Sequence, residues 1–556
     1  MILGGKGISR PARRLALALG RRGAALAVSV SAALAAPAAA QDPLSAIDWL
    51  RDNLTRPEAG AYPISPLEGG GWTQDAITIR LLDATRPESV GLFSAARAGL
   101  PRAIWGPSPD TELAALIRAL PVDTLPALRD LSYRLLLAEF DAPEIPQPPA
   151  SRPPQDTGTT TETDPETRSM VFLLARIDKL IEFGAIDQAA ALLDALEPVH
   201  PDLRLRRFEI ALLLGQEQRA CETMRDAARP FPSEPATIFC RARQGDWEGA
   251  QARLEDARAA GSLGPLYGPL IEHFLDADDH LHNGGPLDIG RPMNLSPLAW
   301  RLLEAIGAPV ATHGLPVAFA HADLRGTIGW RAQLEAAERL VRSGALPPNH
   351  LLGLYTERSA AASGGIWERV RAVQRLERAL EAGDTGATGA ALLTTWLQMV
   401  EGELEVAFAS LYADALLASG LTGEALDLAV IVGLLSENYE QVALDHPGTS
   451  PRARFLNAVA RGLTPGTVRD GEDARRDPAR AAIAEAFAET PPVSEAAQQR
   501  LADGRLGEVL LGTLITLGAA GDPRAMIDAL ATLRHIGLED VARRAALQSL
   551  LLERRG

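Results

Sequence analysis

The chain has 556 residues, of which 46% are hydrophobic and 23% are charged, and this composition is typical of a globular protein with room for several domains. Its 71 acidic residues outnumber its 55 lysines and arginines, which gives a net charge of −16 at pH 7. Because such a charge repels nucleic acid and anionic lipid surfaces, we expect neither as a partner.

The first 40 residues are typical of a secretory signal peptide. They begin with a basic region that contains no acid: Lys6, Arg10, Arg13, Arg14, Arg21 and Arg22. A run of small apolar residues at 24–36 and the sequence Ala38-Ala39-Ala40 follow, so we expect cleavage near Ala40/Gln41. The run is shorter than the about 20 residues that a membrane-spanning helix needs. The sequence therefore predicts no integral membrane segment after cleavage.

Lysine is almost absent from this chain. Apart from Lys6 and Lys179, every basic residue is arginine, and Ala, Gly, Leu and Pro are abundant. This usage suggests a GC-rich bacterial genome. Together with the signal peptide, it predicts the periplasm as the compartment.

Residues 41–141 predict a small, mostly helical N-terminal domain, with helices at about 110–120 and 125–140. Each of these helices is opened by Asp-Thr, and Pro121 separates them. Residues 142–167 are rich in proline and threonine and almost free of hydrophobic residues. We therefore expect a flexible linker there, and the clearest domain boundary.

Residues 168–282 carry an internal repeat. A glycine stands five residues before an alanine in the segments 184–189, 215–220 and 245–250, with the glycines 31 and then 30 residues apart. After each glycine, small or apolar residues recur in steps of four and three, which keeps one helix face inward. A fixed period of this length indicates units that must stack on their neighbours. The sequence predicts an all-α fold, an α-solenoid of helical hairpins.

The segment Gln244-Gly245-Asp246-Trp247-Glu248-Gly249-Ala250 resembles the turn signature of the tetratricopeptide repeat. The family expects glycine or alanine seven residues before the turn glycine, where this chain has Ile177, Phe208 and Ile238. The period is also shorter than the family's 34 residues. The resemblance implies a superhelical scaffold that binds a protein or peptide in a concave groove and has no catalytic activity of its own.

The two cysteines both lie inside the repeats. Cys221 falls on the second helix of the middle unit and Cys240 on the first helix of the next, on either side of the turn at 230–232. Antiparallel helices would bring them level, and an oxidising compartment would favour a disulfide bond. The alternative is a pair of buried free thiols.

The rest of the chain predicts further helices. We expect a loop at 283–297, a continuation of the helical repeats at 298–440, a loop-rich segment at 441–479 and C-terminal helical repeats at 480–556. Gly344, Gly383 and Gly420 stand where helices should end.

Motifs with known chemistry are scarce. The chain has no P-loop, HExxH, nucleophile elbow or CxxC, and we expect no cofactor and no metal. His273, Asp276 and His280 would share a helix face, but the opposite face is apolar, which favours a solvated helix end over a metal site. Glu88-Ser89 resembles the catalytic element of soluble lytic transglycosylases, in which Glu88 would be the general acid/base. Its short spacing to 98–100 and its place before the repeats favour an ordinary loop acid.

These observations lead to one expected function and two alternatives. We expect an exported scaffold that binds a protein or peptide partner in the cell envelope through residues 168–262. Arg176, Arg207 and Arg241 recur just before each turn and are candidates for binding carboxylates, although they could equally compensate helix dipoles. The alternatives are a structural envelope component without a discrete groove and a cell-wall-acting enzyme. The oligomeric state does not follow from the sequence.

Overall fold

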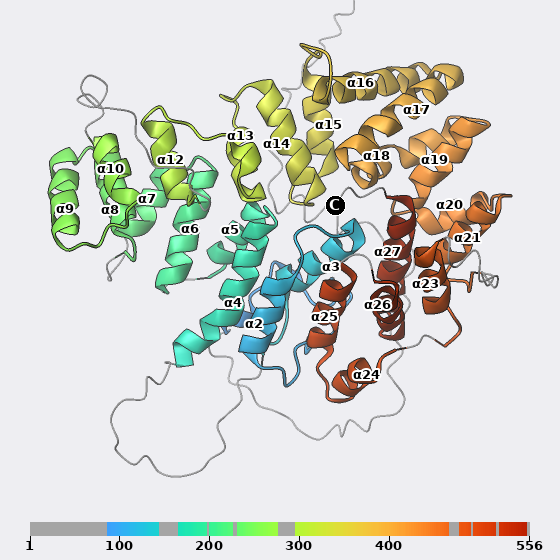
Figure 1. The fold of residues 1–556 in the computed structure, drawn as a ribbon, viewed down its shortest axis with the longest axis horizontal. Coiled ribbons are helices and arrows are strands. Elements are labelled where there is room, and N and C mark those ends of the chain that lie inside the picture. The colour runs from blue at the N-terminus through green and yellow to red at the C-terminus, as the bar shows by residue number, and fades with distance from the viewer. Residues whose placement is uncertain are drawn as a thin grey trace, which may run out of the picture. The chain divides into compact units, whose positions relative to one another are not determined.

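Helices account for nearly all of the regular structure in this protein (Figure 1). The computed structural model describes residues 86–143, 165–196, 200–225, 231–275, 295–465, 477–490, 493–518 and 522–552. Within these residues it has 24 α-helices, which confirms the predicted all-α helical-repeat fold. The predicted signal peptide at 1–40 and most of the predicted linker lie outside the described residues.

The repeat glycines form the turns that the sequence predicts. Gly184, Gly215 and Gly245 have φ angles of 81°, 72° and 88°, a left-handed conformation that costs little without a Cβ atom. They join three hairpins of packed helices. These helices are α4 (Pro165–Glu182), α5 (Ile186–Asp194), α6 (Pro201–Leu213), α7 (Glu217–Arg225), α8 (Glu234–Arg243) and α9 (Trp247–Ala259).

The same packing of consecutive helices continues along the chain. The following helices are α10 (Tyr267–Leu275), α12 (Pro297–Ala305), α13 (Ala320–Asp323), α14 (Trp330–Arg342), α15 (Pro348–Glu357), α16 (Ile366–Ala382), α17 (Thr385–Gly402), α18 (Glu405–Ala418) and α19 (Glu424–Leu434). Two short 3-10 helices, η2 (Thr312–Gly314) and η3 (Val317–Phe319), precede α13. The predicted stops at Gly344, Gly383 and Gly420 are confirmed, since each has a positive φ just after a helix.

The segment 441–479, predicted to be loop-rich, contains helices in its described part. The last helices of the chain are α20 (Tyr439–Asp445), α21 (Pro451–Ala460), α23 (Pro478–Ala486), α24 (Glu495–Ala502), α25 (Leu506–Gly518), α26 (Pro523–His535) and α27 (Glu539–Leu551). Helix α21 begins with Ser450 as its N-cap and Pro451 at its first position, a favourable helix start. Its buried residues include Phe455, Leu456 and Val459. Polar residues stand between and around them, so the sequence shows no clear helical spacing of apolar residues.

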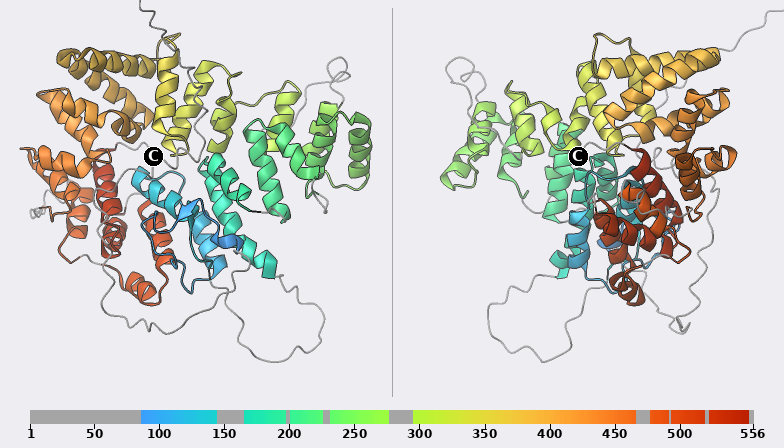
Figure 2. Two further views of the ribbon diagram at one scale, coloured as in Figure 1. Left: turned by 180° about the vertical axis from the view of Figure 1, so that it is seen from behind. Right: turned by 45° about the vertical axis from the view of Figure 1, so that its right-hand side comes forward.

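The N-terminal described segment packs against helices from the end of the chain. It contains η1 (Pro87–Ser89), α2 (Asp110–Ala119), α3 (Pro126–Leu137) and two short strands, β1 (Phe93–Ser94) and β2 (Ala138–Glu139), which pair in parallel. Helix α2 packs against both α4 and α25, and α3 packs against α25 and α27. The blue helices accordingly lie beside the red helices in both figures (Figure 2). One continuous hydrophobic core runs from Phe93 to Leu547, so the first and last helices share it.

A second hydrophobic core lies between α14 and α19, with Leu334, Val370 and Phe408 among its buried members. It encloses a buried ion pair in which Arg369 donates to both carboxylate oxygens of Glu338 at 2.7 Å. The Tyr355 hydroxyl donates to the same carboxylate at 2.6 Å. The charged pair is tolerated in this core because both oxygens of the Glu338 carboxylate accept hydrogen bonds.

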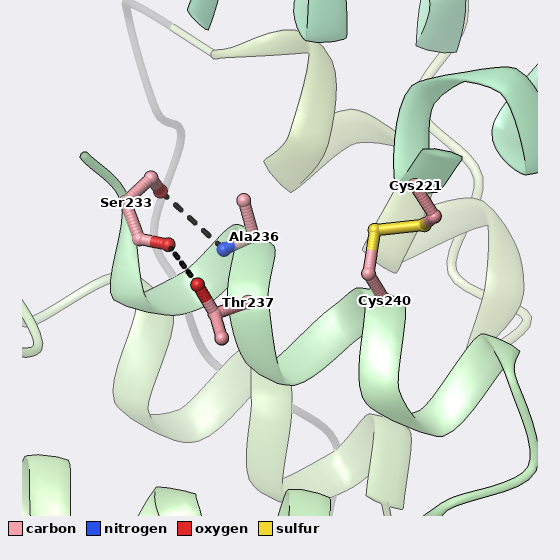
Figure 3. The surroundings of a disulfide bond; sticks show 5 residues. All are labelled: Cys221, Ser233, Ala236, Thr237 and Cys240. Atoms are coloured by element: carbon pink, nitrogen blue, oxygen red, sulfur yellow. Dashed lines mark hydrogen bonds between the residues drawn. A yellow bond between two sulfur atoms is a disulfide. The ribbon is translucent and has the colours of Figure 1, made fainter. Parts of the chain in front are cut away.

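The predicted disulfide is confirmed. Cys221 on α7 and Cys240 on α8 are bonded, with their Cα atoms 5.3 Å apart (Figure 3). Close by, Ser233 caps α8 by accepting a hydrogen bond from the Ala236 backbone N–H at 3.3 Å. The bond links two neighbouring hairpins of the repeat.

Among the residues that the structure describes, none of the helices combines the length and the apolar content needed to cross a bilayer.

Candidate functional site: a cavity where the first and last helices meet

A cavity of about 1230 Å³ lies where the N-terminal helices meet the C-terminal ones. Its wall comes from α3 and the loop before it, the end of α14, the α17–α18 and α19–α20 junctions, and helices α25 to α27. Apolar side chains such as Leu137, Leu346 and Met526 alternate with charged ones. A concave, mainly apolar wall with a few placed polar groups is typical of a binding site.

Hydrogen bonds between distant segments hold this wall together. The Gln548 side chain accepts from the buried Ala127 N–H at 2.9 Å, and Tyr133 donates to the Ser343 carbonyl at 3.0 Å. Arg129 donates to the carbonyls of Arg342, Val122 and Thr124. These contacts fix α3 against both α14 and α27, so the cavity is a built feature of the packing.

Five arginines line the cavity, and they differ in what they bind. Arg129 and Arg339 donate to backbone carbonyls. Arg544 pairs with Asp130 at 3.1 Å and lies 4.0 Å from Asp540. Within the described residues, the guanidinium groups of Arg134 and Arg342 form no hydrogen bond and no ion pair. Two cationic groups of the wall therefore have no partner among the residues that the structure describes.

The pKa values of Arg134 and Arg544 shift in opposite directions, although both residues lie in the same part of the wall. Burial lowers the pKa of Arg134, Asp130 and Asp540 oppose this shift, and the nearby Arg544 adds to it. Burial also lowers the pKa of Arg544, but the carboxylates of Asp130 and Asp540 outweigh it, so its net pKa is raised. Both groups stay charged at any physiological pH. Arg134 is thus the cation whose charge the protein compensates less well.

The carboxylates of the wall are mostly engaged. Asp130 pairs with Arg544, and Asp540 accepts from the Tyr439 hydroxyl at 2.9 Å. Asp522 caps α26 by accepting from the Arg524 N–H at 2.9 Å. Burial raises the pKa of Tyr439, and Asp540 raises it further, so this phenol stays protonated and donating.

The three arginines that the sequence singled out lie elsewhere, and none of them lines this cavity. Arg176 is only 2% exposed, and it donates to the carbonyls of Leu136, Glu88 and Val90. Burial lowers its pKa to about 10. This arrangement contradicts the prediction that Arg176 contacts a partner, because its donors tie α4 to the N-terminal segment.

Arg207 pairs with an acid of the preceding hairpin, and Arg241 pairs with an acid of its own hairpin. Arg207 lies 3.0 Å from Asp194, and Arg241 lies 3.1 Å from Asp246. Both are partly exposed. Their role in partner binding stays a prediction.

Glu88 does not line the cavity either. Its side chain is buried, with one carboxylate oxygen 3.7 Å from Arg86. Of the weighed metal ligands, His273 contacts the Pro269 carbonyl at 3.1 Å, while Asp276 and His280 lie outside the described residues. In the part of the chain that the structure describes, no cluster of three or more His, Cys, Asp or Glu side chains is placed to hold a metal ion.

Sequence reasoning could not find the cavity residues, because they are gathered from both ends of the chain. One local signal did exist, since Asp130 and Arg134 on α3, like Asp540 and Arg544 on α27, are spaced by four residues and share a helix face.

Comparison with protein-family models, with curated proteins and with solved structures finds no match to this chain.

Proposed function

We propose that this protein is an exported bacterial scaffold that binds a protein or peptide partner in the cell envelope, and that the partner inserts a segment into the cavity. The observation that carries the proposal is the cavity itself. At about 1230 Å³ it exceeds the about 300–1,000 Å³ of typical small-molecule pockets. It therefore suits a segment of polypeptide better than a small metabolite.

The mixed wall supports the same conclusion. Apolar positions such as Leu346 and Met526 can receive side chains, while the polar groups between them can bind a backbone or a charged end. The packing of α3 against α27 holds the wall in place before a ligand arrives. Preorganisation of this kind lowers the entropic cost of binding. The alternative of a structural component without a groove gives no reason for such a wall.

Export to the periplasm rests on separate observations. The basic and apolar start of the sequence with its Ala38-Ala39-Ala40 site is typical of a signal peptide. The Cys221–Cys240 bond agrees with an oxidising compartment. The resemblance of the repeats to tetratricopeptide units adds a family-level expectation of protein binding. Cell fractionation, with mass spectrometry of the native N-terminus, tests the compartment and the cleavage site.

Binding is tested with a variant that fills the cavity. Ser410 is an exposed residue of α18 on the cavity wall, so Ser410→Trp should obstruct the space. Thr394→Trp is the matched control, because Thr394 is an exposed hydroxyl residue on α17 that does not line the cavity. Random-sequence peptides displayed on phage would be selected on the mature protein, and the enriched peptides measured against all three proteins.

The expected result is enriched peptides that bind Ser410→Trp about tenfold or more weakly and bind Thr394→Trp like wild type. Equal binding to all three proteins would place the site outside the cavity. Failure to enrich any peptide family would contradict the proposal of a peptide-binding scaffold.

A further inference from the structure

We propose that the cavity recognises its ligand by a carboxylate group, which binds the guanidinium of Arg134 at the contact between α3 and α27. The inference rests on the proposed function, because it names the chemistry of the group that the cavity holds.

Among the described residues, no acceptor binds the guanidinium N–H groups of Arg134. It lies on α3, its side chain is partly buried, and it lines the cavity. Within the described residues its guanidinium makes no hydrogen bond and no ion pair. A guanidinium carries five N–H donors, and desolvating them without acceptors is unfavourable.

Other buried arginines in the protein show what the packing normally supplies. Arg176 donates to several backbone carbonyls, and Arg369 makes a bidentate pair with Glu338. Arg129, in the same cavity wall as Arg134, donates to backbone carbonyls. Arg134 departs from this pattern within the described residues, and we assign the missing acceptor to the ligand.

The nearby acids Asp130 and Asp540 bind groups other than Arg134. Asp130 is one turn before Arg134 on α3, but it pairs with Arg544 at 3.1 Å. Asp540 accepts from Tyr439 at 2.9 Å. Both carboxylates still stabilise the charge of Arg134 at longer range, while Arg544 opposes it. A ligand would therefore meet the Arg134 guanidinium beside two carboxylates, Asp130 and Asp540, that bind Arg544 and Tyr439.

This charge balance favours a carboxylate over a phosphate. A carboxylate brings one negative charge and matches the fork of a guanidinium in a bidentate pair. A phosphate monoester brings a charge of about −1.5 to −2 and would meet the carboxylates of Asp130 and Asp540 at the same place. Arg342, at the end of α14, is a second cation of the wall without a partner in the described residues. It can attract an acidic segment toward the cavity.

The test uses four pools of short, random-sequence peptides with a biotin tag at the N-terminus. The random positions contain no Asp or Glu, so the carboxylate is placed by design. One pool has a central Glu and an amidated C-terminus, the second has Gln in place of that Glu, the third has Gln and a free C-terminal carboxylate, and the fourth has phosphoserine with an amidated C-terminus. Binding to the full mature protein is measured on a sensor surface.

Wild-type protein should bind at least one carboxylate pool about tenfold or more tightly than the Gln amide pool, as expected for a charge-assisted bidentate bond. The comparison of the Glu pool with the free-terminus pool shows which carboxylate is bound. Arg134→Gln should abolish the preference. Arg331→Gln should keep it, because Arg331 is 69% exposed at its side chain and does not line the cavity.

Thermal unfolding separates this role from a structural one. Because Arg134 makes no bond within the described structure, Arg134→Gln should unfold at the same temperature as wild type or a higher one. A variant that unfolds at a clearly lower temperature yet retains the carboxylate preference would overturn the proposal. Tighter binding of the phosphoserine pool than of both carboxylate pools would also overturn it, by assigning the site to phosphate.

Two further outcomes distinguish this inference from the proposed function. Equal binding of the Glu, Gln and free-terminus pools, with loss of all of it in Ser410→Trp, would refute carboxylate recognition and leave peptide binding in the cavity intact. No binding of any pool would count against both proposals.

Discussion

The side-chain oxygen of Gln548 accepts a hydrogen bond from the backbone N–H of Ala127 at 2.9 Å, across 421 residues of sequence. Ala127 lies in the first turn of α3, where backbone N–H groups have no partner within the helix. The N-cap residue of α3, Leu125, supplies no side-chain acceptor. Gln548 of the last helix, α27, therefore caps the N-terminus of α3. This contact joins the two ends of the helical array beside the cavity.

Replacing Gln548 by Leu should test this cap. The substitution keeps the side-chain size and leaves the buried Ala127 N–H without an acceptor, so unfolding free energy should fall by about 1–2 kcal/mol. Urea denaturation measures the loss, and hydrogen exchange should show faster opening of α3. Gln441→Leu is the control, because Gln441 is exposed and, among the described residues, its side-chain amide donates to Asp445 alone. Equal stability of the two variants would mean that the cap contributes nothing.

The contact between α25 and the N-terminal segment depends on a missing side chain. A Cβ atom at Gly507 would lie 2.4 Å from the ring of Trp105, which is buried. Gly507→Ala should therefore overpack this contact and cost about 1–3 kcal/mol.

The matched control lies in the same helix. Gly512 has an open space around its Cβ direction, so Gly512→Ala should instead stabilise α25 by about 0.5–1 kcal/mol. Thermal and urea unfolding of both variants provide the comparison. If both alanines stabilised the protein alike, the close approach of α25 to Trp105 would be incorrect.

A buried histidine predicts how stability depends on pH. His321 is 7% exposed, and its Nε2 lies 2.7 Å from the Gly184 carbonyl oxygen, to which it donates. Burial lowers the pKa of His321 from its usual value of about 6.5, His350 lowers it too, and Asp187 opposes the shift. The folded state therefore favours the neutral imidazole. Its contribution to stability is complete above about pH 6.5 and is lost as the pH falls below that value.

His321→Gln keeps a donor for the Gly184 carbonyl and removes the titration. Between about pH 6.5 and pH 5, the unfolding free energy of the wild type should fall more steeply than that of the variant, by at most about 1.4 kcal/mol per pH unit for one proton. Urea denaturation at a series of pH values measures both slopes. His313→Gln, the same substitution at an exposed position, is the control for the change of residue type. An unchanged slope in His321→Gln would contradict the assignment of a neutral buried imidazole.

Local chemistry explains which parts of the fold the sequence predicts. The turns at Gly184, Gly215 and Gly245 follow from the tolerance of glycine for a positive φ, and the helix faces follow from the spacing of small residues. The Cys221–Cys240 bond could be predicted because the two cysteines are 19 residues apart on neighbouring helices. All of these features are decided within one or two repeat units.

Long-range packing explains what the sequence does not predict. The cavity requires α3 and α27 to meet, and no periodicity marks a contact such as Arg544 with Asp130 across 414 residues. The prediction for Arg176 failed for the same reason. Its position before a turn is visible in the sequence, but the carbonyls of Leu136 and Val90 that surround it come from another segment.

The buried pair of Arg369 and Glu338 allows a last prediction about the second core. The side chains are only 10% and 7% exposed, and Tyr355 donates to the same carboxylate. Arg369→Met removes the cation and leaves Glu338 buried with one hydrogen bond. We expect this single change to lower the free energy of unfolding by about 3–5 kcal/mol, the typical result of breaking a buried ion pair from one side.

The triple variant Glu338→Leu, Arg369→Met, Tyr355→Phe removes every polar group of the cluster, so it should recover most of that loss. Urea denaturation of the three proteins measures both steps. A triple variant as unstable as the single one would show that the ion pair itself, and not only its completeness, stabilises the core.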